Sequence, residues 1–195
     1  DKNFYRHHGL DYKGIARAIV KNIQARSFRQ GASTISQQLV KNTQLSSEKT
    51  LARKLKEIKL TKQLERRFSK NKILESYLNT IYFGHGCYGI AGAANYYFGK
   101  EPADLSAAEG ATLAAVIRSP NNYSPFVAPE KCKKVRDGIL KQMLSLGYLT
   151  QSEYDEAVQQ PLPLRSENSI GSQCYLAAVY DELESLPIFA PYELR

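Results

Sequence analysis

Hydrophobic residues recur at helical spacing along most of this chain. Between residues 14 and 24, Ile15, Ile19 and Ile23 fall four positions apart, as they would on one face of an amphipathic helix. Similar spacing predicts further helices, which start near residues 34, 46, 71, 106, 130 and 150. No stretch of useful length alternates between apolar and polar residues in the way that a β-strand requires. We therefore expect a mainly α fold.

Local patterns mark where several of these helices begin and end. A hydroxyl residue followed three positions later by Glu or Gln, the pattern of a capping box, begins at Thr34, Ser106 and Thr150. Glycines at positions 99 and 147 are typical helix stops. We expect a glycine-rich link at 83–92, and loops at 26–31 and 121–129.

The 195 residues are 43% hydrophobic and 24% charged, which is enough apolar material for one folded domain. Helical periodicity weakens after Pro161, so we assign residues 1–160 to the domain and 161–195 to a linker toward something that is absent. The longest apolar run, 111–117, is far shorter than the ~20 residues of a membrane span. Because the chain starts without Met or a signal-peptide pattern, we expect a fragment of a longer protein.

Basic residues outnumber acidic ones by 27 to 19, a formal net charge of +8. Such a chain tends to meet nucleic acid, an acidic membrane surface or a phosphate-bearing substrate. The charge is concentrated between residues 41 and 72, where eleven Lys or Arg stand against three Glu. A solvated helix face is the ordinary explanation for such a run, and only the spacing of particular residues favours a site.

Two polar stripes have that spacing. Thr34, Gln38 and Lys41 lie at i, i+4 and i+7, so a hydroxyl, an amide and an ammonium group share one side of a helix. A hydroxyl-rich helix N-terminus near several cations is a good pyrophosphate site.

The second stripe lies on the next helix. Arg53 and Glu57 are four positions apart, and Lys54 and Glu57 are three apart. Leu60 and Leu64 continue this stripe, and a wholly exposed stripe would not need them. We therefore expect it to face a cleft, where a carboxylate could orient the neighbouring cations.

Residues 1–11 are rich in polar groups. His7 and His8 are adjacent, diverge on a helix and lack H-E-x-x-H spacing, which disfavours a metal site. The open alternatives are a hydrogen bond from one histidine to a carboxylate, Asp1 or Asp11, and a direct contact with substrate.

Three cysteines, Cys87, Cys132 and Cys174, are widely spaced and contain no C-x-x-C pair. This pattern argues against a zinc site and against a disulfide-dense scaffold. We expect three separate thiols.

Five segments, in order, resemble the motifs of the peptidoglycan glycosyltransferase domain of class A, bifunctional penicillin-binding proteins. Residues 1–11 resemble E-D-x-x-F-x-x-H-x-G-x-D without its first residue, and 31–42 resemble G-x-S-T-I-T-Q-Q-x-x-K-N. Residues 53–57 match R-K-x-x-E, while 72–79 and 118–125 resemble the fourth and fifth motifs. Five motifs in order are far more specific than any one alone.

The resemblance implies a lysozyme-like helical glycosyltransferase fold with a small membrane-facing lobe. It also implies that residues 161–195 are a linker toward a missing transpeptidase domain. The implied reaction polymerises lipid II into linear β-1,4 glycan strands by inverting transfer, releasing undecaprenyl pyrophosphate. It implies no required cofactor, although Mg²⁺ or Mn²⁺ could accompany the substrate pyrophosphate. The implied partners are lipid II, the growing strand, the membrane surface, a moenomycin-type inhibitor and cell-wall synthesis proteins, with no nucleic acid. The implied location is the extracytoplasmic face of the bacterial cytoplasmic membrane, with an anchoring N-terminal helix absent here.

The resemblance also assigns roles to residues. Glu57 matches an essential catalytic carboxylate. Substrate-binding positions match Asp1, Phe4, His7, Ser33, Thr34, Gln38, Lys41, Asn42, Arg53, Lys54 and Arg118, and no metal ligand is implied. The family's general base is a Glu that would directly precede Asp1, so we expect the chain alone to be inactive. Ser36 replaces the usual Thr and keeps its hydroxyl.

Two other functions remain as alternatives. A lysozyme-like glycan-cleaving enzyme would need a carboxylic acid in an apolar pocket, whereas Glu57 is flanked by cations. A basic helical module that binds nucleic acid would need lysines facing phosphates, but not the polar set from Gln38 to Asn42.

Overall fold

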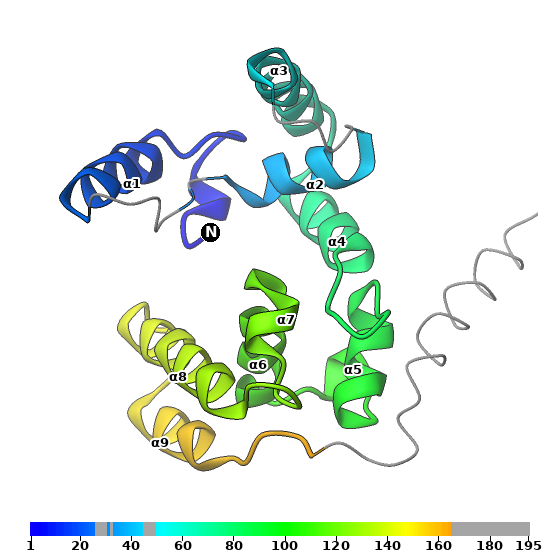
Figure 1. Cartoon of the computed structure of the whole chain (residues 1–195), viewed down its shortest axis with the longest axis vertical. Helices are drawn as coiled ribbons and strands as arrows, with labels where there is room; N and C mark the ends of the chain where they lie inside the picture. The colour runs from blue at the N-terminus through cyan, green and yellow to red at the C-terminus, as the bar shows by residue number, and fades with distance from the viewer. Residues whose placement is uncertain (26–30, 32, 45–49, 165–195) are drawn as a thin grey trace, which may run out of the picture. The chain divides into compact units, whose positions relative to one another are not determined.

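The computed structural model describes residues 1–25, 31, 33–44 and 50–164. Within these ranges the chain is helical, and the only β pairing is an isolated bridge between Tyr82 and Tyr88. The expected mainly α class is confirmed. The chain divides into two compact units, Asp1–Ile81 and Tyr82–Arg195, and Figure 1 labels their helices.

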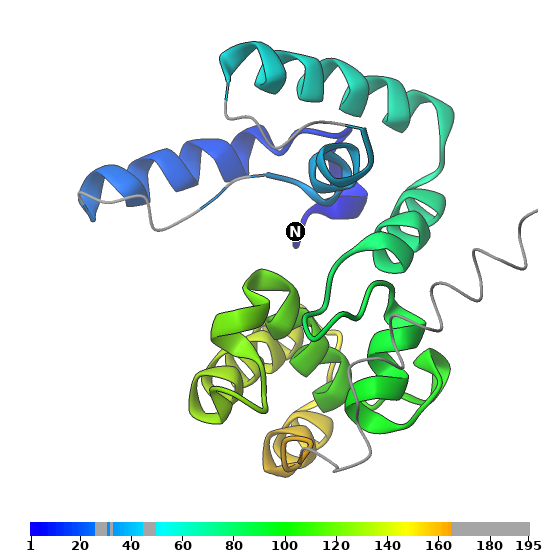
Figure 2. The same ribbon diagram turned by 45° about the vertical axis from the view of Figure 1, so that its right-hand side comes forward.

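The first unit is built around α2, which packs against both α3 and α4 (Figure 2). Buried apolar side chains on α2 (Leu39, Val40) and on α4 (Ile73, Tyr77) supply much of its core. The elements of this unit are η1 (Phe4–Arg6), α1 (Tyr12–Gln24), α2 (Ile35–Gln44), α3 (Leu51–Arg67) and α4 (Lys70–Thr80).

Side-chain caps begin three of these helices. The side chains of Asp11, Thr50 and Ser69 each accept a hydrogen bond from a backbone N–H in the first turn of α1, α3 and α4 respectively. The helix expected to start near residue 46 therefore begins at Leu51. Residues 45–49 lie outside the described residues, as do residues 26–30 of the expected loop.

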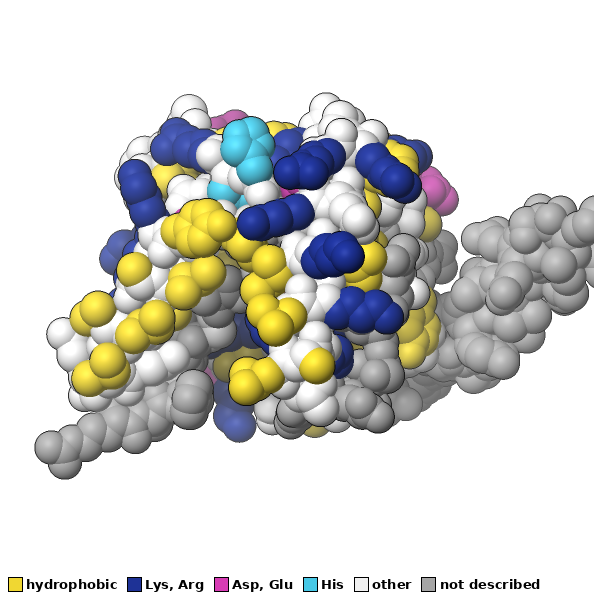
Figure 3. Space-filling model, turned by 90° about the horizontal axis from the view of Figure 1, so that it is seen from above, with side chains coloured by type: hydrophobic (Ala, Val, Ile, Leu, Met, Phe, Trp, Pro, Cys, Tyr) yellow, Lys and Arg dark blue, Asp and Glu magenta, His cyan; other side chains and the backbone are white. Residues whose placement is uncertain are grey.

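Two helices of the first unit keep much of their apolar face exposed. On α1, Ile19 and Ile23 are exposed and Ala18 is the one buried residue. On α3, Leu51 and Leu55 are 87% and 69% exposed. Figure 3 shows hydrophobic side chains running along α1 on the same face as a group of Lys, Arg and His side chains.

The second unit is organised by α6, which packs against α7 and α8, while α9 packs on α8. Small residues let these helices approach closely, and Ala108, Ala111, Leu140 and Ala157 form one buried cluster. The elements of this unit are α5 (Ile90–Phe98), η2 (Pro102–Asp104), α6 (Ala107–Arg118), α7 (Pro120–Tyr123), α8 (Pro129–Ser145) and α9 (Gln151–Gln159).

The second unit confirms most of the expected boundaries. Both predicted capping boxes, at Ser106 and Thr150, are present, and Gly99 ends α5 with a left-handed φ of 63°. The expected loop at 121–129 is wrong in part, because Pro120 begins the short helix α7 and Pro129 begins α8. Proline is favourable in the first turn of a helix, where its missing N–H would have no partner.

The remaining expectations had mixed outcomes. The glycine-rich link, expected at 83–92, ends at residue 89, since α5 starts one residue later.

Cys132 is a buried free thiol, but Cys87 is disulfide-bonded, so the expectation of separate thiols is wrong for Cys87. Cys174 and the expected linker, from residue 165 onward, lie outside the described residues. Residues 161–164 have no regular structure.

Candidate active site

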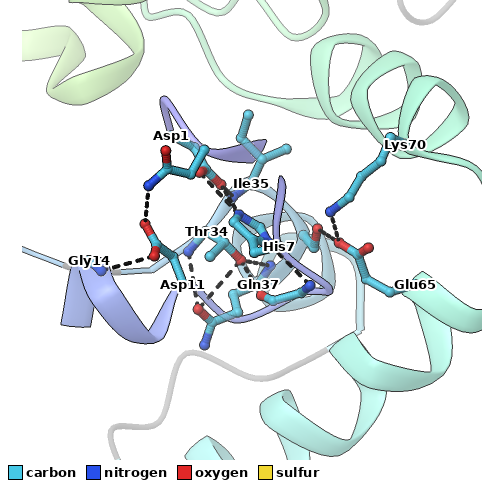
Figure 4. Close-up of polar contacts among 12 residues, drawn as sticks. Asp1, His7, Asp11, Gly14, Thr34, Ile35, Gln37, Glu65 and Lys70 are labelled. Carbon is cyan, nitrogen blue, oxygen red and sulfur yellow. Dashed lines mark hydrogen bonds and ion pairs between the residues drawn. The ribbon is translucent and has the colours of Figure 1, made fainter. Parts of the chain in front are cut away.

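A histidine–carboxylate pair holds the N-terminal turn against the start of α2. His7 Nδ1 accepts the backbone N–H of Gly9 over 3.2 Å, which assigns the ring proton to Nε2. Nε2 then donates to the Asp1 carboxylate over 3.1 Å, and the backbone N–H of Ile35 donates to the same carboxylate over 3.0 Å (Figure 4). Of the alternatives left open for the histidines, a hydrogen bond between His7 and Asp1 is confirmed.

A close backbone approach follows in the chain. Gly9 has a φ of +90°, and a Cβ at this position would lie 2.9 Å from the Thr61 methyl group on α3. The Gly9 carbonyl accepts the hydroxyl of Thr34 over 2.6 Å. Only glycine fits here, because any side chain would push the turn away from both α3 and Thr34.

Thr34 and Gln37 form the predicted capping box at the start of α2. The Gln37 backbone N–H donates to Thr34 Oγ1 over 3.2 Å, and the Thr34 N–H donates to Gln37 Oε1 over 3.1 Å. Because Oε1 is used in this way, the amide nitrogen of Gln37 points toward α3. There it donates to Oε1 of Glu57 over 3.2 Å.

Glu57 is a buried carboxylate, only 2% exposed, between two cations of its own helix. Arg53 Nη1 lies 3.2 Å from Oε2, and Lys54 Nζ contacts Oε1. The expected pairs at i+4 and i+3 are therefore confirmed. With Gln37 as a third partner, the buried carboxylate is compensated by two cations and one hydrogen bond, and neutralising Glu57 would leave both cations without the charge that holds them.

A second ion pair joins α3, α4 and the N-terminal turn. Glu65 lies 2.7 Å from Lys70 Nζ and also accepts the hydroxyl of Ser36 on α2. Lys70 in turn stands over the buried ring of Phe4, with Nζ 4.5 Å from the ring centroid. Figure 4 shows Glu65 and Lys70 beside His7 and Asp1.

The sequence-predicted site residues of the first unit fall into two groups. One group is joined by hydrogen bonds and ion pairs that run through Gln37, and its members are Asp1, His7, Thr34, Arg53, Lys54 and Glu57. The other predicted residues lie outside this network. Gln38 accepts the hydroxyl of Tyr77 over 3.2 Å, while Ser33, Lys41 and Asn42 are exposed. Burial raises the pKa of Tyr77 to about 12, so this hydroxyl remains a donor at neutral pH.

Arg118 belongs to the second unit. It ends α6, where its guanidinium carbon lies 5.6 Å from the centroid of the Tyr123 ring.

Three functional candidates were not predicted as site residues. Gln37 was expected only as a helix cap, and Glu65 and Lys70 only as members of the charged run. One signal for Gln37 was available in the sequence. A capping box uses only the side-chain oxygen of its Gln, so the NH₂ group of Gln37 was left free to donate to another residue.

Two classes of feature are absent from the part of the chain that the structure describes. No three His, Cys, Asp or Glu side chains there lie close enough together to hold a metal ion. No helix there is both long enough and apolar enough to span a bilayer.

Comparison with known proteins identifies the class. The family model described as Transglycosylase matches residues 1–144. The match covers the first unit, the second unit as far as residue 144 and every site residue described above, so the chain belongs to the transglycosylase family.

Individual relatives are penicillin-binding proteins by name. The chain is 48% identical over 168 residues to penicillin-binding protein 1A of Aquifex aeolicus, covering 86% of this chain and 23% of that protein. It is 50% identical over 153 residues to penicillin-binding protein 1F of Bacillus subtilis, covering 78% and 21%. The chain thus spans about a fifth of the length of these relatives.

A crystal structure of penicillin-binding protein 1A from Haemophilus influenzae is also similar. The TM-score is 0.46 at 27% identity, and the match covers 66% of this chain and 16% of that one.

Proposed function

We propose that this domain polymerises lipid II into linear β-1,4 glycan strands of peptidoglycan. In this reaction the 4-hydroxyl of one lipid II attacks the anomeric carbon of the growing chain. The bond from that carbon to the acceptor oxygen forms as its bond to the pyrophosphate oxygen breaks, with inversion. The hydroxyl proton passes to a base, and undecaprenyl pyrophosphate leaves as the anion.

The observation that carries the proposal is the buried Glu57 carboxylate. It holds Arg53 and Lys54 from one side, and each of these cations has further N–H donors besides the one that contacts Glu57. Lys54 keeps 41% of its side chain exposed, and Lys41 on the neighbouring helix is exposed as well. A set of oriented cations of this kind suits the charge that develops on a departing pyrophosphate.

Asp1, His7 and Phe4 have a different role in this proposal. They shape the acceptor side, and the base is a glutamate that would precede Asp1. No cofactor is required, and a divalent cation, Mg²⁺ or Mn²⁺, would bind with the substrate pyrophosphate rather than in a site of its own. Arg118 is proposed as a further cation for the substrate phosphates.

The proposed setting is the extracytoplasmic face of the bacterial cytoplasmic membrane. The substrates carry lipid tails there, and the exposed apolar residues of α1 are suited to an amphiphilic surface. A moenomycin-type inhibitor, which also carries phosphate and lipid, would compete for the same cations. Other cell-wall synthesis proteins are proposed as partners.

The experiment is incubation with lipid II in a membrane-mimicking detergent. The protein is supplied with a glutamate directly before Asp1, and the matched control carries glutamine there. We expect glycan polymer and released undecaprenyl pyrophosphate from the glutamate version alone. Sugar released from finished peptidoglycan, without polymer from lipid II, would overturn the proposal in favour of glycan cleavage.

A further inference from the structure

A basic groove lies on the first unit, and Glu57 does not line it. It has a volume of about 780 Å³ and runs between the N-terminal turn, the first turn of α1 and the last turns of α3. Four cations line it: Arg6, Lys13, Lys62 and Arg66. Glu57 and the two cations paired with it are not among the lining residues.

The positive charge of this groove is not compensated within the described chain. None of the four cations forms an ion pair with a described carboxylate. The two acidic residues that also line the groove are already engaged. Asp11 accepts the Gly14 N–H over 2.9 Å as the cap of α1, and Glu65 is paired with Lys70. All four cations are exposed, so an incoming anion can reach them.

The groove is bordered by apolar surface. Tyr12, which lines it, is 68% exposed, and α1 continues from there with Ile19 and Ile23 at 53% and 70%. On the face shown in Figure 3, Lys, Arg and His side chains gather beside the hydrophobic strip of α1. Nucleic acid would neutralise the cations but leave this strip in water, whereas a lipid satisfies both parts of the surface.

We infer that this groove binds the phosphate headgroup of an anionic phospholipid, with α1 lying along the bilayer interface. The headgroup phosphate lies among the four cations, and the apolar residues of α1 contact the acyl boundary. The groove shares His7 with the proposed acceptor side but contains none of the proposed pyrophosphate cations. Headgroup binding is measured on vesicles without lipid II, so the inference does not depend on turnover. Loss of polymerisation and loss of headgroup binding are therefore distinguishable.

The test measures binding of the full chain to phosphatidylcholine vesicles with and without phosphatidylglycerol. The groove variant combines Arg6→Ala, Lys62→Ala and Arg66→Ala. The control variant combines Lys131→Ala, Lys134→Ala and Lys141→Ala, which remove the same charge from exposed positions of α8. The groove variant should bind phosphatidylglycerol vesicles on the order of 100-fold more weakly, while the control should change by less than about threefold.

Three outcomes would overturn the inference. Equal losses in the two variants would mean diffuse attraction by net charge. If the groove variant has native circular dichroism and binds phosphatidylglycerol vesicles as before, Arg6, Lys62 and Arg66 do not bind the headgroup. A further set of phosphatidylcholine vesicles contains lipid II. If the groove variant loses binding to these vesicles but still binds phosphatidylglycerol vesicles, the groove binds the substrate.

A measurement on the unaltered chain removes any dependence on folding of the variants. Short-chain phosphatidylglycerol, kept below its micelle concentration, should shift the NMR signals of His8, which also lines the groove, in a saturable manner. No shift, or an equal shift with short-chain phosphatidylcholine, would count against a headgroup site.

Discussion

The side-chain amide of Gln37 donates a hydrogen bond to Glu57 over 3.2 Å, linking the cap of α2 to the buried carboxylate of α3. The carbonyl of the same amide accepts the Thr34 N–H, so one side chain both starts a helix and orients the site. Glu57 is therefore positioned from two helices at once, by its own cations on α3 and by the first turn of α2.

Gln37→Glu separates these two tasks. A glutamate keeps the oxygen that caps α2, but it cannot donate to Glu57 and places a second carboxylate beside it. We expect native helix content and polymerisation reduced on the order of 10- to 100-fold, because each tenfold corresponds to about 1.4 kcal/mol. Initial rates with lipid II measure this, and Gln63→Glu on the exposed side of α3 is the matched control. Equal rates for the two variants would remove Gln37 from the site.

Lys41→Ala tests the proposed pyrophosphate cations. Lys41 is exposed and forms no ion pair with a described carboxylate, so its removal leaves the Glu57 network intact. A charge-assisted hydrogen bond contributes roughly 1.5–3 kcal/mol, so affinity for a moenomycin-type inhibitor should fall about tenfold or more. Calorimetric titration measures the affinity, and Lys131→Ala on α8 should leave it unchanged. If both variants bind alike, Lys41 does not contact the phosphate.

The cap of α1 gives a pH dependence with a definite sign. The Gly14 backbone N–H, followed by the side-chain amide of Asn3, holds the pKa of Asp11 below its ordinary value. The stability contribution of this ionised cap is fully present above the unfolded-state pKa of about 3.9 and is lost as pH falls through the folded-state pKa.

Asp11→Asn keeps a capping oxygen without the charge. It should therefore lower stability near neutral pH, by about 0.5 kcal/mol, and make no difference well below the pKa of Asp11. Urea unfolding of both proteins across this pH range tests the sign. A difference that stays constant with pH would contradict the role of the charge.

Buried Arg136 should be the most sensitive charged position of the second unit. It is 1% exposed and donates to the carbonyls of Gln160 and Val158 at the end of α9, over 2.7 Å and 3.1 Å. Arg136→Met keeps the bulk but leaves both carbonyls without this donor, at a cost of roughly 3 kcal/mol.

Lys133→Met provides the matched control for that change. Lys133 pairs with Asp137 at the surface of the same helix, and its loss should cost no more than about 1 kcal/mol. Denaturant unfolding measures both. Similar losses for the two variants would show that the buried contacts of Arg136 contribute little.

Much of the fold was predictable because its determinants are local in the sequence. The capping boxes at Ser106 and Thr150, the stop at Gly99 and the pairing of Glu57 with Arg53 each depend on residues three or four positions apart. Periodicity also placed the helices, but it cannot tell whether an apolar face is covered. Leu55 continues a regular apolar face and is nevertheless 69% exposed.

The parts of the site that could not be predicted depend on contacts between helices. The bond from Gln37 to Glu57 spans 20 positions, and the bond from Ser36 to Glu65 spans 29. Both need the packing register of α2 on α3, which no local pattern encodes. The turn at Gly9 is similar, because its need for glycine arises from Thr61 on a distant helix.

The most direct test of the account is the rate of lipid II polymerisation by Glu57→Gln in the version that carries a glutamate before Asp1. Glutamine fills the same volume but has no charge to hold Arg53 and Lys54, so we predict a rate at least about 100-fold lower with native circular dichroism. A well-folded Glu57→Gln protein that polymerises lipid II at the normal rate would contradict the central role of this carboxylate.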